Sequence, residues 1–245
     1  GGVFLSTSML AIVGIGLVLL VVPTPQQVLL HRDAGIVRGA LRPALANSEL
    51  LRLNYGIACL HAILMATFLA IPLALQQQAG LPKEEHWWVY LAALLLSFFG
   101  MVPFIIYAER QRQMKRVLLG AVALLVLVQP LFWLIQASLP WLVACIILFF
   151  VGFNLLEATL PSLLSKIAPA GGKGTAMGVY STSQFAGAAL GGMFGGWLFA
   201  HFGLGGVFVG CALLALSWLA IGVTMREPPY VTSYRLAVSS DRIRD

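Results

Sequence analysis

Long runs of apolar residues dominate this chain and restrict the folds open to it. A stretch of about 20 apolar residues is long enough to cross the hydrocarbon core of a bilayer as a helix. Only helices and closed barrels satisfy their backbone hydrogen bonds in lipid, and continuous rather than alternating apolar runs favour helices. We therefore predict an all-α membrane protein with seven transmembrane helices. The predicted spans lie near residues 3–22, 54–75, 87–107, 117–136, 141–165, 174–201 and 204–225.

The composition argues against several functional classes. Charged residues make up only 10% of the chain, against about a quarter in soluble domains. The net charge is +6, but the basic residues that cause it lie in the segments that flank the predicted spans. We therefore expect no nucleic-acid partner. Cys59, Cys145 and Cys211 lie in apolar runs without the spacing of a metal site. We expect them to be small packing residues, and we predict no metal, no other cofactor and no enzymatic activity.

The Lys and Arg residues fall almost entirely on one side of the predicted spans. All but one of the 15 follow the first, third, fifth or seventh span, and only Lys83 lies on the other side. Loops rich in Lys and Arg remain in the cytoplasm. We therefore predict that the N-terminus of this chain lies outside the membrane and the C-terminus inside. The opening residues lack an initiator Met and a signal peptide, so we expect a cut end within a longer protein.

Two titratable residues lie well inside the predicted spans. Glu157 is the only acidic residue so placed, and His61 is the only histidine. A charged side chain at the bilayer centre costs at least about 2.5–3.5 kcal/mol, so such residues mark ion or substrate pathways. His61 lies nine residues from Arg52, and Glu157 lies nine residues from Lys166, which places both about 13–14 Å from the cytoplasmic flank. We predict that Glu157 binds a proton or substrate with His61 as its partner. The alternative for His61 is a packing role.

Other side chains share helix faces with these two residues. Asn154 lies one turn before Glu157, the sixth span carries a polar face near the cytoplasm, and the second span extends the face of His61 with larger side chains. We expect these faces to line a cavity. The predicted proton- or substrate-binding residues are Glu157, His61, Asn154, Tyr180, Gln184, Met65 and Phe68.

The sixth span also contains a row of small residues. Gly187, Gly191 and Gly195 recur every four residues and therefore lie on one helix face. Such rows let helices approach closely. Tight packing alone is one interpretation, and a sliding interface between moving helix bundles is the other.

The order of the spans predicts a further symmetry. The second, third and fourth spans run in the opposite directions to the fifth, sixth and seventh, which is the arrangement of one half of many transporters. We predict a 3+3 inverted-repeat bundle over residues 54–225. Residues 1–22 form a preceding helix, residues 23–53 a cytoplasmic linker, and residues 226–245 the start of a cytoplasmic domain.

Five stretches of the sequence resemble the C-terminal half of major facilitator superfamily transporters, most closely the proton-driven, drug-efflux-like bacterial members. These stretches are LNYGIACLHAILMATF, VPFIIYAERQRQMKRV, FNLLEATLPSLLSK, KGTAMGVYSTSQF and TMREPPYV. The resemblance implies that residues 1–22 are the sixth of twelve helices and that residues 54–225 are the seventh to twelfth. A missing N-terminal bundle of the same protein would then be this chain's partner.

The resemblance also assigns a role to the loop after the third span. It implies a degenerate copy of the family's cytoplasmic-loop motif, running from Gly100 to Lys115. Glu109 would take the acidic role, with Arg110 and Arg112 as basic members beside Lys115. This motif would act as a conformational latch that faces helix ends across the bundle. A solvated charge run that sets topology is the alternative.

The function implied by the resemblance is proton-coupled export of small hydrophobic or drug-like compounds by alternating access, in a bacterial inner membrane. The expected partners are membrane lipid, a small-molecule substrate and protons. A facilitator or symporter for sugars or organic acids is the first alternative. A seven-helix receptor is a remote one, and a piece that is inactive by itself is a third.

Overall fold

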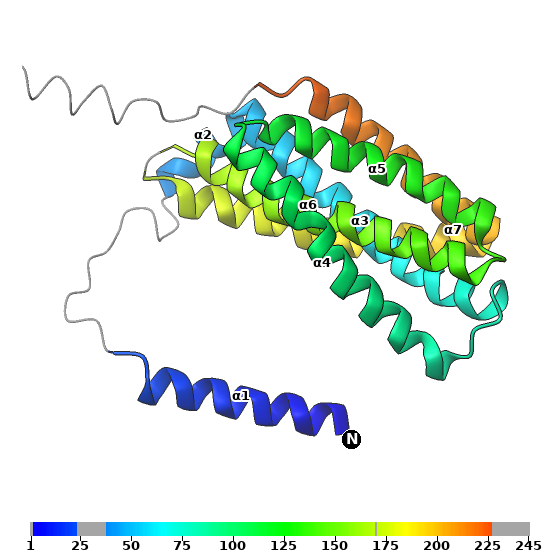
Figure 1. Ribbon diagram of the computed structural model, residues 1–245. Coiled ribbons are helices and arrows are strands. Elements are labelled where there is room, and N and C mark those ends of the chain that lie inside the picture. Colours follow the sequence, from blue (N-terminus) through cyan, green and yellow to red (C-terminus); the bar gives the residue numbers. More distant parts are fainter. Residues whose placement is uncertain (1, 24–37, 170, 227–245) are drawn as a thin grey trace, which may run out of the picture. The chain divides into compact units, whose positions relative to one another are not determined.

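The structure is a computed structural model that describes residues 2–23, 38–169 and 171–226 (Figure 1). The described residues contain helices and no strand. Five of these helices are long and apolar enough to cross a membrane, and a shorter apolar helix covers Phe4–Leu20. The all-α, multi-pass membrane architecture predicted from the sequence is therefore confirmed. The elements are α1 (Gly2–Leu20), α2 (Arg38–Ala46), α3 (Ser48–Gln77), the 3-10 turn η1 (Lys83–Glu85), α4 (His86–Arg110), α5 (Met114–Ile135), α6 (Leu139–Ile167) and α7 (Lys173–Val223).

The chain divides into two compact units, one within residues 1–32 and the other within residues 33–245. The first unit contains α1, a shorter apolar helix whose polar side chains, Ser6, Thr7 and Ser8, follow one another near its start. Its Ser8 hydroxyl donates a 2.9 Å hydrogen bond to the carbonyl of Phe4. This bond satisfies the polar group within the helix itself.

α3 begins at Ser48, before the predicted start of its span at residue 54. Asn47 adopts an extended conformation, and its Oδ1 accepts hydrogen bonds from the backbone N–H groups of Glu49 and Leu50, at 2.9 and 3.3 Å. An asparagine in this position satisfies donors that the first turn leaves unpaired. The helix therefore extends past the apolar run that predicted it.

α7 is interrupted at Gly203, between the predicted spans 174–201 and 204–225. The φ of 63° and ψ of −160° at this residue are not helical, and glycine adopts such a conformation without a steric penalty. Beyond the break the helix folds back, since a Cβ at Gly210 would lie only 2.6 Å from Cδ1 of Leu198. Residues 173–202 and 204–223 therefore pack against each other, and Figure 1 shows the second stretch, in orange, returning along the bundle.

Helices α3 to α7 form one packed bundle. α3 packs most extensively against α7, while α6 lies against both α4 and α5. At the centre, Phe132 of α5 stacks on Phe208 of α7 at 5.3 Å and contacts Phe149 of α6 at 6.1 Å between ring centroids. Lipid tails are as apolar as these side chains, so close packing and buried polar contacts hold the helices together.

One buried polar contact joins α5 to α3 within this core. The Gln129 amide donates to the Thr67 hydroxyl at 3.1 Å, and both side chains are fully buried. Thr67 also lies 3.9 Å from the Cys211 sulfur of α7. Cys59, Cys145 and Cys211 are all free and buried, which matches their expected role as packing residues.

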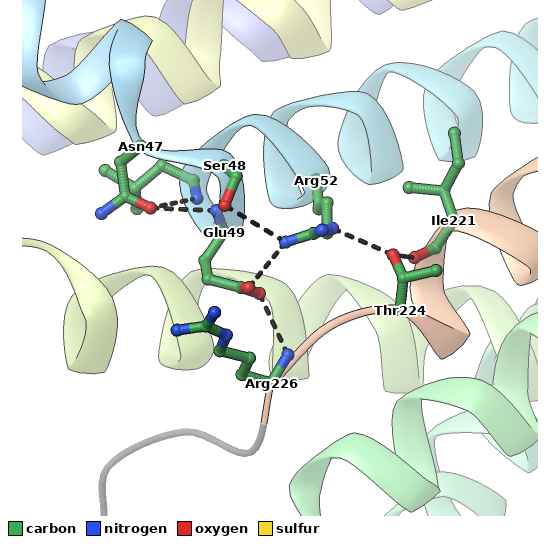
Figure 2. Close-up of polar contacts among 8 residues, drawn as sticks. Asn47, Ser48, Glu49, Arg52, Ile221, Thr224 and Arg226 are labelled. Atoms are coloured by element: carbon green, nitrogen blue, oxygen red, sulfur yellow. Dashed lines mark hydrogen bonds and ion pairs between the residues drawn. The ribbon is translucent and has the colours of Figure 1, made fainter.

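A polar cluster joins the start of α3 to the end of α7 (Figure 2). The Arg52 guanidinium pairs with Glu49 at 2.6 Å and donates to the Thr224 hydroxyl at 3.0 Å. The second carboxylate oxygen of Glu49 accepts from the backbone N–H of Arg226 at 3.2 Å. These contacts hold the start of α3, the first helix of the bundle, beside the end of α7, the last helix.

Two of the predicted segments fall partly outside the described residues. The linker predicted at 23–53 is described at residue 23 and over residues 38–53, where it contains α2 and the start of α3. Of the tail predicted at 226–245, the structure describes residue 226 alone.

Candidate functional site

The two titratable residues singled out in the sequence lie in contact inside the bundle. His61 projects from α3 and Glu157 from α6, and the imidazole Nε2 lies 3.3 Å from Oε1 of the carboxylate. This is an ion-pair distance without the alignment of a hydrogen bond. The imidazole is 13% exposed and the carboxylate 33%. The carboxylate is therefore the more exposed of the two groups, although the oxygen that faces His61 is itself buried.

Gln184 of α7 completes a three-helix cluster around the imidazole. Its amide nitrogen lies 2.8 Å from Nε2 of His61. An amide nitrogen only donates, so with this amide orientation Nε2 must accept, and the proton of a neutral ring resides on Nδ1. Exchanging the amide oxygen and nitrogen places the proton on Nε2 instead. The orientation of Gln184 therefore determines which nitrogen of His61 carries a proton.

Two aromatic side chains border this cluster. Phe153, one turn before Glu157 on α6, packs edge-on against the His61 ring at 5.9 Å between centroids. Tyr180, one turn before Gln184 on α7, is 4% exposed, lies within electrostatic range of Glu157, and has a hydroxyl without a hydrogen-bond partner among the described residues. The cluster thus has one apolar wall and one further buried polar group.

Asn154 lies one turn before Glu157, but its amide serves a different contact. The amide nitrogen donates to the Ser97 hydroxyl of α4 at 3.0 Å, and Ser97 in turn donates to the carbonyl of Leu94. Asn154 therefore connects α6 to α4. Ser97 is fully buried, and no pattern in the sequence distinguished it from the apolar residues around it.

Met65 and Phe68 extend the α3 face of His61 into an aromatic group. Both are partly exposed, at 37% and 40%. Phe68 stacks on Tyr90 of α4 and packs edge-on against Phe150 of α6, with both centroid distances at 5.9 Å. Tyr90 and the α6 phenylalanines were not among the residues predicted from the sequence to line a cavity. The spacing of Phe149, Phe150 and Phe153 was the available signal, since it places aromatic rings on adjacent faces of one helix.

The basic loop after α4 carries one clear ion pair. Glu109 accepts from the Lys166 ammonium at 3.1 and 3.2 Å, which connects the end of α4 to the end of α6. Gly100 packs α4 closely on α6, because a Cβ there would lie 2.9 Å from Cγ2 of Val151. Arg112 turns the chain with a φ of 54°, while Arg110 and Lys115 lie at the same end of the bundle. Lys166 was not among the predicted latch residues.

The glycine row of the sixth predicted span lies against α3. A Cβ at Gly187 would overlap the backbone of Ala58, one at Gly191 the backbone of Ala62, and one at Gly195 would lie 2.8 Å from Cβ of Ala66. The contacts advance in the same direction along both helices, so the two helices run parallel here. Gly192 and Gly196, on the neighbouring face, have no such atom within 4 Å.

The model of the Major Facilitator Superfamily matches residues 1–192 and 115–239 of this sequence. The chain belongs to this superfamily. Members of the superfamily are generally non-enzymatic transport proteins, so membership favours a transporter over the receptor alternative.

The chain is also similar to individual superfamily transporters. It is 50% identical to the inner membrane transport protein YajR of Escherichia coli over 238 residues, which are 97% of this chain and 52% of that protein. It is 27% identical to the multidrug resistance protein MdtH of Aeromonas hydrophila over 76% of this chain and 45% of that protein. The chain thus spans about half the length of the relatives it matches. The similarity to YajR confirms the resemblance that the five quoted stretches carry.

Proposed function

We propose that this chain is the C-terminal part of a proton-coupled secondary transporter that exports small hydrophobic or drug-like compounds by alternating access. The observation that carries the proposal is the His61–Glu157 contact between two apolar helices, at 3.3 Å. Intramembrane ionisable groups that pair with each other are typical of proton relays. The superfamily supplies the expectation of transport, and this pair supplies a place for the proton.

The coupling follows from the placement of the pair on different helices. With Nε2 of His61 3.3 Å from Oε1 of Glu157, a proton can pass between two side chains that belong to different helices. A movement of α6 relative to α3 would separate the two groups and so interrupt that transfer. Binding and release on opposite sides of the membrane then require only that the movement also changes which side reaches the carboxylate.

In the proposed architecture, α7 consists of two membrane spans joined at Gly203. Helices α3, α4 and α5 then form one triplet, and α6 with residues 173–202 and 204–223 forms an inverted second triplet. Binding sites in this architecture lie near the bilayer midplane between the repeats. The His61–Glu157 pair joins the first helix of each proposed triplet, which is the position a central site requires. The basic loops place the C-terminus in the cytoplasm under this proposal.

The aromatic surroundings favour hydrophobic substrates. Phe68, Tyr90, Phe150 and Phe153 form a continuous set of ring contacts beside the pair. Such surfaces bind apolar and cationic aromatic compounds through large contact area and cation–π attraction. A facilitator or symporter for sugars or organic acids is the alternative. The hydroxyl groups of a sugar would need more hydrogen-bonding side chains than these aromatic rings supply.

The test is a flux measurement on the complete transporter that contains this chain. In proteoliposomes with an imposed pH gradient, Glu157→Gln should abolish proton-driven export of a lipophilic cation, because the amide does not titrate. Glu85→Gln, at an exposed carboxylate in η1, is the matched control and should leave export unchanged. Wild-type flux with an unaltered pH dependence in Glu157→Gln would overturn the proton role. Export of a sugar in place of the cation would support the alternative.

A further inference from the structure

A hollow lies between α4, α5 and α6, away from the proposed proton site. Its volume is about 810 Å³. Phe104 of α4, Gly120 of α5 and Leu155 of α6 are among the apolar residues that line it, while Tyr107 and Arg116 are its polar members. Volumes of this size are typical of sites for organic ligands. We call this hollow the α4–α6 groove.

The shape of the groove is fixed by contacts on both sides of it. Asn154 binds Ser97 at 3.0 Å on one side, and Lys166 binds Glu109 at 3.1 Å on the other, so α4 is joined to α6 twice. The α4 wall of the groove lies between these two contacts. On the α5 wall, a Cβ at Gly120 would meet no atom within 4 Å. The groove is therefore a formed feature with an open face.

The polar groups of the groove are concentrated at one end. Arg116 is exposed and lies in the first turn of α5, next to the basic loop, and Tyr107 lies near the adjoining end of α4. The α5 wall continues from Arg116 to Leu124, a distance of about 12 Å at 1.5 Å per residue. A molecule that fits this groove has a negatively charged group at one end and an apolar chain behind it.

We propose that the α4–α6 groove binds an anionic phospholipid, with one acyl chain along Phe104, Gly120 and Leu155 and the headgroup phosphate on Arg116. Basic pockets between membrane helices bind anionic headgroups in this way, and the leaflet on the cytoplasmic side supplies them. A zwitterionic headgroup also carries a phosphate, but its ammonium group offsets the attraction to Arg116, so an anionic headgroup binds more strongly. A transported cation is repelled by Arg116 and has its own carboxylate at Glu157. The site is thus separate from the proposed proton pathway.

The experiment uses the complete transporter that contains this chain, purified and delipidated in detergent. It is titrated with phosphatidylglycerol carrying a photoactivatable diazirine in one acyl chain, and with the matching phosphatidylcholine. Mass spectrometry locates the cross-links. Arg116→Gln is compared with Arg42→Gln, an exposed arginine on α2. Gly120→Leu, which fills the groove, is compared with Gly192→Leu, an equally open glycine on α7.

We expect phosphatidylglycerol to cross-link to the residues of α4, α5 and α6 that line the groove. Arg116→Gln should weaken its binding about fivefold, the effect of one basic group on an anionic lipid, and should weaken the binding of zwitterionic phosphatidylcholine less. Gly120→Leu should reduce cross-linking by both lipids. Cross-links elsewhere, or equal phosphatidylglycerol binding by Arg116→Gln and Arg42→Gln, would overturn the proposal. Should Gly120→Leu fail to fold, the arginine comparison decides the question alone.

Discussion

At the scale of single residues, Gln184 is the side chain whose role the structure changes most. Its amide contacts the His61 imidazole at 2.8 Å, on the same nitrogen that faces Glu157. We expect Gln184→Ala to slow proton-coupled transport and to displace the midpoint of its pH profile by up to about one unit, since a hydrogen bond of about 1 kcal/mol then acts unequally on the two protonation states. The measurement is initial flux against pH in proteoliposomes.

A control separates this positioning role from loss of structure. Gln184→Glu keeps the shape of the side chain but replaces the amide nitrogen with an oxygen, which accepts from the imidazole only when Nε2 carries a proton. It should therefore restore folding and flux at some pH while giving a profile unlike that of Gln184→Ala. Identical profiles for wild type and both variants would show that Gln184 does not act on His61.

The residues of this cluster illustrate what a sequence supplies at this scale. Depth followed from the distance of His61 and Glu157 to the flanking Arg52 and Lys166, because a helix rises by a constant amount per residue. The rotation of each helix about its own axis could not be predicted in this way. The sequence placed Asn154 on the edge of Glu157, yet its amide binds Ser97 on another helix. Whether two side chains meet depends on which faces of their helices pack together, and that is decided by the whole bundle.

At the scale of the helices, the parallel contact between α3 and α7 depends on glycine at three positions. We expect Gly191→Ala to destabilise the protein by about 1–3 kcal/mol or more, because the added methyl would overlap the backbone of Ala62, which has no flexible side chain to move aside. Gly192→Ala is the matched control, with no atom within 4 Å of its Cβ. Thermal unfolding of the purified complete transporter measures both. Equal unfolding midpoints would contradict the close contact.

The ion pair between the ends of α4 and α6 tests the proposed latch. Glu109 is 51% exposed and Lys166 27%, so the pair contributes at most about 1 kcal/mol to stability. We expect Glu109→Lys and Lys166→Glu each to lower the transport rate with little change in unfolding temperature, and the double exchange to restore it. A transport rate unchanged by the single variants would contradict the latch. The basic loop would then act only by setting the orientation of the helices in the membrane.

The existence of the helices was predictable, and their ends were less so. Apolar runs located α3 to α7, since lipid demands such runs in every span. Hydropathy marks where lipid ends rather than where a helix ends, so the start of α3 at Ser48 depended on the Asn47 cap instead. The turn at Gly203 lies between the predicted spans at residues 201 and 204, where the sequence offers a glycine for the required conformation.

At the scale of the whole molecule, the distribution of basic residues predicts the orientation in the membrane. In the predicted topology, Lys83 lies on the opposite side of the membrane from every other Lys and Arg of the sequence. We expect a membrane-impermeant maleimide to label Lys83→Cys in intact cells, and Gln111→Cys only after the cells are permeabilised. Both positions are exposed. The three native cysteines are no more than 4% exposed, so the unsubstituted protein serves as a background with little labelling. Labelling of Gln111→Cys alone in intact cells would show that the orientation is opposite to the predicted one. The side of the membrane from which Glu157 first receives its proton would then be opposite as well.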